Sequence, residues 1–220
     1  FVSVLLNGYG YVATGAFPDT VDFGGSALHA KTYDPEGAKE VLEAAGWKDS
    51  DGDGIREKDG QKLTIKWLTY PTRQELPLLA EAAQASLKEI GIEVDINNTL
   101  DVNEVAQDAS AWDVYAMANV QAPTGDPEYW FRVFALSDSA KNQGKYSNAQ
   151  LDALDEQLSQ EFDTAKRADL AVQMQQILLD DNAFVFCSFL KMSMISRSNV
   201  SNYTSHACDY YQITADLDIE

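Results

Sequence analysis

The residues best suited to binding a ligand lie in one turn-rich stretch that ends in aromatic side chains, Ala122–Phe131. It falls between a predicted strand and a predicted helix. In an α/β fold, that position opens onto the crevice beyond the carboxyl end of the strand, where ligands usually bind. The residues expected to face ligand or solvent are Gln121, Ala122, Pro123, Thr124 and Tyr129.

Neighbouring side chains have structural as well as functional interpretations. Trp130 and Phe131 could stack on a ligand, but we expect them to pack the following helix onto the sheet. Tyr70 and Arg73 lie at another strand-to-helix junction, on the same predicted edge of the sheet. Arg73 could pair with an anionic group of a ligand, or it could be a solvated arginine near a helix start.

Three aspartates suggest a calcium loop that the rest of the pattern does not complete. Asp49, Asp51 and Asp53 take the first, third and fifth places of an EF-hand loop. The last place, where the motif needs a bidentate glutamate, is Gly60, and a strand rather than a helix is predicted to follow. We therefore expect a tight acidic turn and no metal site.

No catalytic or cofactor motif is present in the sequence. His29 and His206 lack metal-ligand spacing, and no G-x-S-x-G elbow or dinucleotide fingerprint occurs. Cys187 and Cys208 form no C-x-x-C pair, although a disulfide between them is an open alternative in an extracytoplasmic protein. We expect a protein that is not an enzyme and needs no cofactor.

The composition excludes several classes of partner. The formal charge of −19 over 220 residues leaves no excess of basic side chains for nucleic acid or anionic membranes, and solubility is its simplest interpretation. No apolar run reaches the roughly 18 residues that a membrane helix needs. The chain opens on the apolar run Phe1–Leu6, followed by Asn7 and Gly8. This resembles the end of a helix, so we expect a fragment of a longer protein.

The first half of the chain contains a predicted β-α-β unit. A helix capped by Asp34 and ended by Gly46 comes first. Alternating apolar residues then predict a strand at 63–68, and a Thr72–Glu75 capping box starts a helix that runs to about Ile90. A second strand follows at 92–97. Strands joined by such a helix should be parallel.

The second half adds helices and a further strand. We expect a short helix at 101–109, a third strand at 112–118 and an exposed loop at 137–146. The apolar run Phe184–Leu190 predicts a central strand with 191–197 beside it, and the tail after Asn199 has possible short strands. Further helices are expected at 127–135, from a Ser147–Gln150 capping box onward, and at 164–180. The inward side chains expected on the last two helices are Leu151, Leu154, Leu158, Leu170, Met174, Ile177 and Leu178. Residues 1–220 are therefore interpreted as one α/β domain whose mixed, mostly parallel sheet is flanked by helices.

Several of these segments, taken in order, resemble the second lobe of a family 5 extracellular solute-binding protein. This is the family of dipeptide, oligopeptide and nickel-chelate receptors of ABC importers. The residues that carry the resemblance are Asn7-Gly8-Tyr9-Gly10, Tyr33-Asp34-Pro35-Glu36, Leu42 to Trp47, Asp51 to Gly60, Gly125-Asp126-Pro127 and Tyr146-Ser147-Asn148.

The resemblance implies a lobe of the periplasmic binding protein type II kind and a transport function. Such receptors hold a small ligand between two lobes that close around it. The implied partners are a peptide-like or nickel-chelate ligand, an N-terminal lobe of the same protein and an ABC permease in the membrane. The implied location is extracytoplasmic, in the periplasm or lipid-anchored at the outer face of the cell membrane. The alternatives are a signalling or docking module that keeps the receptor fold and, as a third hypothesis, an enzyme.

The resemblance also bears on the ligand. Peptide receptors of the family carry an aspartate four residues before the proline of the Gly-Asp-Pro turn, where it pairs with the amino group of the peptide. Pro123 takes that place here. The Ala-Pro ahead of Asp126-Pro127 is closer to the nickel receptors, but the histidine that those receptors offer in the next loop is absent from Leu136–Gly144. Asp126 is expected to cap a helix rather than to anchor ligand.

Overall fold

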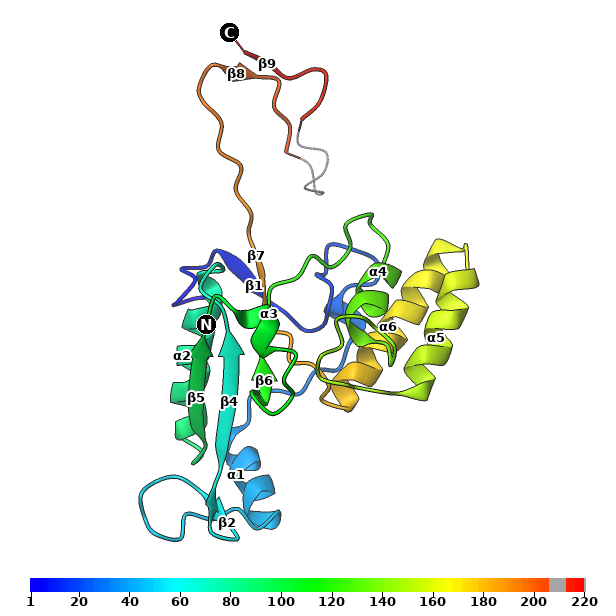
Figure 1. Cartoon of the computed structure of the whole chain (residues 1–220). Coiled ribbons are helices and arrows are strands. Elements are labelled where there is room, and N and C mark those ends of the chain that lie inside the picture. Colours follow the sequence, from blue (N-terminus) through cyan, green and yellow to red (C-terminus); the bar gives the residue numbers. More distant parts are fainter. Residues whose placement is uncertain (206–212, 220) are drawn as a thin grey trace. The chain divides into compact units, whose positions relative to one another are not determined.

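The computed structural model describes residues 1–205 and 213–219 (Figure 1). The chain divides into two compact units, and each is described by itself below. Unit 1 contains Phe1, Ser3–Leu6 and Lys31–Asn119. Unit 2 contains Val2, Asn7–Ala30 and Val120–Glu220. That residues 1–220 together form one lobe stays a prediction.

Unit 1 is built on a parallel three-stranded sheet. Its strands are β4 (Thr64–Thr69), β5 (Glu93–Asn98) and β6 (Val114–Tyr115), in the order β5-β4-β6. The helix α2 (Glu75–Lys88) connects β4 to β5 and lies along them (Figure 1). The predicted β-α-β unit with parallel strands is thereby confirmed, as is the predicted fold class of a mostly parallel sheet flanked by helices.

One face of β4 contributes to the buried core of unit 1. Leu68 is fully buried against Val102 and Ala106, which belong to or follow the short helix α3 (Val102–Val105). Trp67 lies on the opposite face of the strand, because side chains alternate along it. The predicted Thr72–Glu75 capping box is wrong: α2 starts after Gln74 without any side-chain cap.

A buried arginine holds the remaining parts of unit 1 together. The helix α1 (Pro35–Ala44) is capped by Asp34 as predicted, and the hairpin of β2 (Glu57–Lys58) and β3 (Gln61–Lys62) follows it. Arg56, just before β2, donates its Nε to the carbonyl of Ile90 at 2.8 Å and one Nη to the carbonyl of Trp47 at 3.0 Å. The segment at 51–60 is therefore held by this side chain as well as by its turn.

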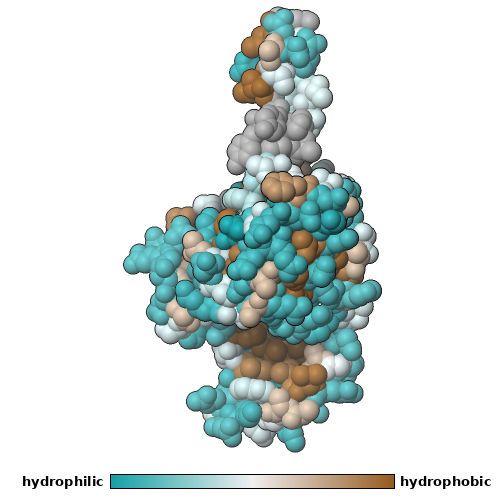
Figure 2. All heavy atoms as spheres, turned by 90° about the vertical axis from the view of Figure 1, so that its right-hand side faces the viewer, coloured by the Kyte–Doolittle hydropathy of each residue, from teal (hydrophilic) through white to brown (hydrophobic). Residues whose placement is uncertain are grey.

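Unit 2 contains a pair of neighbouring helices, α5 (Ala149–Gln160) and α6 (Thr164–Asp180) (Figure 1). Figure 2 looks onto this side of the unit, where hydrophilic residues dominate the surface. Most of the side chains predicted to face inward are fully or almost fully buried: Leu151, Leu154, Leu158, Met174 and Leu178. Leu170 and Ile177, also predicted to face inward, are half-buried. Asn148, not the predicted Ser147, caps α5, because its Oδ1 accepts the amides of Gln150 and Leu151.

An aromatic cluster forms the core beside these helices. The helix α4 (Glu128–Trp130) continues directly into a π-helical turn, η2 (Phe131–Ala135). Trp130 lies at the centre, with ring centroids 5.3 Å from Phe184 and 5.7 Å from Phe186. The loop that follows η2 is not uniformly exposed as predicted: Asn142 is buried and donates to the carbonyls of Leu136 and Tyr146.

The strands of unit 2 are short, and this corrects the prediction for Phe184–Leu190. Only Ser188–Leu190 (β7) is a strand; it pairs antiparallel with β1 (Gly10–Val12) in a two-stranded sheet, and Val185 is 86% exposed. The run is apolar because Phe184 and Phe186 pack on Trp130, not because it crosses the middle of a sheet. No strand forms over 191–197.

Smaller features complete the description of the chain. The tail contains β8 (Val200–Ser201) paired with β9 (Asp218–Ile219), as the possible short strands predicted. A 3₁₀ turn, η1 (Gly25–Ala27), lies in the loop before α1. Residues 2–8 form turns rather than a helix end, although Asn7 and Gly8 have the positive φ angles that end helices.

Candidate functional site

The loop Gln121–Pro127 contains a tight turn in unit 2. The amide of Gly125 donates to the carbonyl of Ala122 at 3.0 Å, and Gly125 has a φ of 78°, a left-handed conformation that glycine adopts without strain. Thr124 and Gly125 are exposed, whereas Gln121 to Pro123 are half-buried and Pro127 is buried. The turn therefore presents Thr124 at its tip.

The carboxylate of Asp126 stabilises the loop through contacts within the protein. Its Oδ1 accepts the amide of Glu128, the first residue of α4, at 2.9 Å, as expected of a residue at a helix start. Its two carboxylate oxygens also receive Arg167 from α6, with Nη2 at 2.7 Å from Oδ2 and 2.8 Å from Oδ1. Sequence reasoning missed Arg167, because this residue lies 41 positions after Asp126.

The aromatic residues after the turn divide between surface and core. Trp130 is 3% exposed and Phe131 is fully buried, which confirms that both pack in the core. Beyond their own helical segment, the rings that they contact belong to Phe17, Phe184 and Phe186, none of which lies in a strand, and not to a sheet as predicted. Tyr129, which precedes them in the sequence, is 42% exposed. Its ring is therefore accessible to a ligand, in keeping with its proposed contact with ligand or solvent.

The other predicted site residues, Tyr70 and Arg73, belong to unit 1. The hydroxyl of Tyr70 accepts the amide of Ala118 at 3.2 Å, which ties the segment after β6 to the end of β4. It also contributes to a raised pKa of the neighbouring Tyr115, whose main cause is burial. Arg73 is exposed in the turn before α2. The loop Gln121–Pro127 belongs to unit 2.

The acidic segment at 49–54 forms the tight turn that the sequence predicts. Asp49 accepts the amides of Gly52 and Gly54, and the ammonium group of Lys62 pairs with Asp53. The bond from Lys62, followed by the bond from the amide of Ile55, holds the pKa of Asp53 below its usual range. Ligand oxygens of Asp49, Asp51, Asp53 and Glu57 lie within 4.8 Å of one another, so a cation could be held here. The expectation of no metal stays a prediction.

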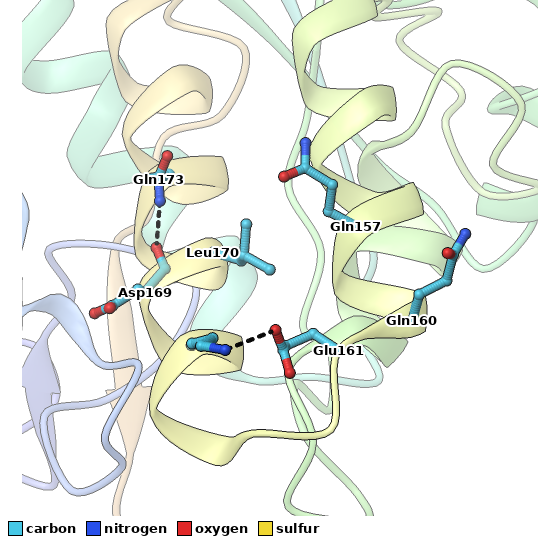
Figure 3. Close-up of a pocket in the computed structure, with 7 residues that line it drawn as sticks. Gln157, Gln160, Glu161, Asp169, Leu170 and Gln173 are labelled. Atoms are coloured by element: carbon cyan, nitrogen blue, oxygen red, sulfur yellow. Dashed lines mark hydrogen bonds and ion pairs between the residues drawn. The ribbon is translucent and has the colours of Figure 1, made fainter.

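A shallow depression of about 500 Å³ lies between α5 and α6 (Figure 3). Gln157, Gln160 and Glu161 approach it from α5 or its end, and Asp169, Leu170 and Gln173 approach it from α6. Lys166 pairs across its end with Glu161 at 3.6 Å. Its lining is mostly polar and open to solvent, unlike the enclosed, largely apolar sites that hold small molecules.

The histidines and cysteines add little to the site. His29 is exposed, and its backbone amide and carbonyl both bond to Gln176. Cys187 is half-buried, and this burial raises the pKa of its thiol. His206 and Cys208 lie outside the described residues, so the alternative of a Cys187–Cys208 disulfide is untested.

Among the described residues, no helix combines the length and the apolar character needed to cross a membrane.

Comparison with known proteins identifies relatives over most of the chain. The family of bacterial extracellular solute-binding proteins, family 5 middle, matches residues 1–142. The chain is 28% identical over 203 residues to the nickel-binding protein NikA of Staphylococcus aureus, covering 90% of this chain and 38% of NikA. It is 28% identical over 178 residues to the oligopeptide-binding protein AppA of Bacillus subtilis, covering 79% of this chain and 32% of AppA. The chain therefore spans less than half the length of these relatives.

Solved structures agree with the sequence relatives. A nickel ABC transporter protein from Bacillus halodurans superposes with a TM-score of 0.76 at 28% identity, over 99% of this chain and 45% of that one. NikA of Staphylococcus aureus in complex with Ni(L-His)2 gives a TM-score of 0.78 at 25% identity, over 100% of this chain and 45% of that one.

Proposed function

Because the chain belongs to family 5 of the bacterial extracellular solute-binding proteins, we propose that it is a ligand-binding lobe of the substrate-binding component of an ABC importer. The observation that carries this proposal is the family match over residues 1–142, which includes the entire loop Gln121–Pro127. In the proposed mechanism, this lobe and a second lobe of the same protein close around a small solute by a hinge motion. The loaded receptor then delivers the solute to a membrane permease without changing it chemically.

The groups that this lobe offers to a ligand are mainly uncharged. The exposed Thr124 and the accessible ring of Tyr129 are the leading contacts from unit 2, next to the backbone and side chains of Gln121, Ala122 and Pro123. A tyrosine supplies a large apolar area with one hydroxyl at low cost in conformational entropy. From unit 1 we propose Tyr70 and Arg73, with Arg73 pairing with an anionic group of the ligand.

The charge on the loop bears on the class of ligand. Its one carboxylate, Asp126, is held by Arg167 and by the amide of Glu128. A free amino group of a ligand would have to compete with a guanidinium for it. Pro123 offers no charge. The ligand is therefore a solute whose positive charge is masked or bound elsewhere. We propose a nickel chelate or a peptide-like compound.

The partners and the location follow from the same function. The permease and the second lobe are the proposed protein partners, and the protein acts outside the cytoplasm, in the periplasm or anchored at the outer face of the cell membrane. The family is described as extracellular, and one relative is the nickel-binding periplasmic protein of Escherichia coli.

Thermal unfolding of the full-length protein that carries this chain tests the proposal. The ligands to add are Ni(II) with L-histidine, dipeptides and longer peptides, heme, and sugars. A ligand present at a hundred times its Kd stabilises the folded state by about 2.7 kcal/mol, because it binds only that state. We expect one class of compound to raise the melting temperature in a saturable way.

Matched aromatic variants locate the site. Tyr129→Ala should weaken the stabilising ligand by roughly tenfold, the cost of truncating an aromatic contact at an interface. Phe162→Ala is the control, since Phe162 is 89% exposed at the turn between α5 and α6. Arg73→Gln tests the contact proposed in unit 1. Absence of a shift with every compound would contradict transport and favour a docking role, and chemical turnover of a bound compound would contradict a pure receptor.

A further inference from the structure

Five charged side chains of unit 2 form a continuous chain that begins in the candidate ligand loop. Their signs alternate, and each is within 3.2 Å of the next: Asp126, Arg167, Glu128, Arg132 and Asp155. Asp126 lies in the loop, and Asp155 lies in the middle of α5 on its buried face. The chain of ion pairs therefore connects the loop to the helix-packed interior of the unit.

Arg167 is the most firmly held residue of this ion-pair chain. Its side chain is only 15% exposed, and its Nη1 donates to the carbonyls of Leu158 and Glu161 at the end of α5. These bonds orient the guanidinium. Its other two nitrogens form a two-pronged contact with Asp126, in which Nε donates to Oδ2 at 3.1 Å and Nη2 donates to Oδ1 at 2.8 Å. Such planar, bidentate pairs set geometry as well as adding binding energy. Through this contact, the turn that carries Asp126 is held against α6 and the end of α5.

Asp155 is the titratable end of the chain. One carboxylate oxygen lies 3.2 Å from Nε of Arg132, and the other is buried with no hydrogen-bond partner among the described residues. Burial raises the pKa of Asp155 to about 6, opposed by Arg132. The carboxylates of Glu128 on α4, Asp138 after η2 and Asp152 on α5 raise it further.

The charge balance of the ion-pair chain depends on whether Asp155 is protonated. With Asp155 ionised, three carboxylates share two guanidinium groups, and Glu128 and Asp155 repel each other across Arg132. With Asp155 protonated, two carboxylates face two guanidinium groups and the repulsion is removed. Because the pKa of this acid is raised in the folded state, its contribution to stability is complete below about pH 4 and is lost as the pH rises through about 6.

We propose that Arg167 is a positioning residue that holds the loop Gln121–Pro127 in its ligand-binding conformation, and that protonation of Asp155 strengthens this hold through Arg132 and Glu128. The inference rests on the proposed function for the identity of the loop as a ligand site. Ligand capture is then tighter near pH 5 than near pH 7.5. On this proposal, the conformational order of the loop depends on whether Asp155, at the other end of the ion-pair chain, is protonated.

Amide hydrogen exchange of the ligand-free, full-length protein tests the inference without any ligand. We expect faster exchange in the peptide covering Gln121–Phe131 for Arg167→Met, and partial recovery for Arg167→Lys. Lys166→Met is the matched control: it removes a neighbouring, 67% exposed charge that pairs only with Glu161 among the contacts described. If Arg167→Met does not fold, Asp126→Asn releases the loop and leaves the bonds of Arg167 to the α5 carbonyls intact.

Amide exchange at two pH values tests whether protonation of Asp155 changes how firmly the loop is held. After correction for intrinsic exchange rates, the loop of the wild-type protein should be more protected at pH 5 than at pH 7.5. Asp155→Asn should abolish this difference. Loop exchange that is unchanged in Arg167→Met, or a pH difference that persists in Asp155→Asn, overturns the inference.

Ligand affinity adds a second, independent readout. With Ni(II) and L-histidine as the probe, or the peptide that stabilises the protein in thermal unfolding, Arg167→Met should weaken binding by roughly tenfold at a temperature where every variant is folded, the loss expected for a charged hydrogen bond. If no probe binds but loop exchange responds as described, the proposed function fails and the positioning role stands. If a probe binds and Arg167→Met changes neither affinity nor exchange, the positioning role fails and the proposed function stands.

Discussion

Gln175 is fully buried on α6 and holds the loop that precedes α1. Its Oε1 accepts the amide of Ala16 at 3.0 Å, and its Nε2 donates to the carbonyl of Phe23 at 2.9 Å. A buried amide side chain is favourable only when its polar atoms are paired, and both ends of this one are paired. The loop at 13–30 has little regular structure, so these bonds replace the ladder that a sheet would provide.

Replacing Gln175 should destabilise the protein strongly. Gln175→Leu leaves the amide of Ala16 and the carbonyl of Phe23 buried without partners, at a cost of about 1 to 3 kcal/mol for each group. Gln173→Leu is the control, because Gln173 is exposed on the same helix and bonds only within it, to the carbonyl of Asp169. Urea unfolding followed by circular dichroism measures both. Equal midpoints for the two variants would contradict the role given to Gln175.

At the scale of elements, the start of α5 offers two neighbouring residues that could each cap the helix. The sequence Tyr146-Ser147-Asn148 offers two adjacent capping residues, and the spacing of a capping box favours Ser147. In the structure Ser147 bonds to the hydroxyl of Ser137 at 2.9 Å, and Asn148 accepts the first amides of α5. Asn148 also donates to Asp181 at the end of α6, and this second contact favours it as the cap.

Two alanine variants distinguish these caps. Asn148→Ala should lower the stability of the protein by about 1 kcal/mol or more, the typical cost of losing a helix cap. Ser147→Ala should cost much less, because it removes only a surface hydroxyl contact. Thermal unfolding of the two variants under identical conditions gives the comparison. A larger loss for Ser147→Ala would restore the capping box that the sequence predicts.

At the scale of the whole molecule, the chain spans 38% of NikA and 32% of AppA. In the proposed mechanism a ligand is buried only when two lobes close on it, so a single lobe supplies part of the contacts and no closure. Hinge closure contributes to affinity only through contacts that differ between the open and closed states.

The 220-residue chain by itself should therefore bind the ligand of the longer protein weakly. Isothermal titration of both, with circular dichroism to show that the isolated chain is folded, tests this. We expect the isolated chain to lose at least roughly tenfold in affinity, which corresponds to about 1.4 kcal/mol. Saturable binding of equal strength by the isolated chain would overturn the two-lobe mechanism.

The sequence by itself determined the features that depend on near neighbours. The periodicity around Leu63–Ile96 predicted a parallel β-α-β unit, and the leucine stripes predicted α5 and α6, because apolar spacing reports directly which face of a helix or strand is buried. The position of Trp130 and Phe131 in the core and the turn at Gly125 were accessible in the same way. The family was recognisable from ordered motifs such as Asp51 to Gly60.

Only the tertiary structure decided which distant residues meet. The apolar run Phe184–Leu190 is a central strand by its pattern, yet it folds largely as an aromatic lining for Trp130, since hydrophobicity does not specify its partner. Arg167 contacts Asp126 although it lies 41 positions further along the chain, and burial raises the pKa of Asp155. Ion pairing and desolvation depend on distances in three dimensions, and these are not encoded in the spacing of residues along the chain.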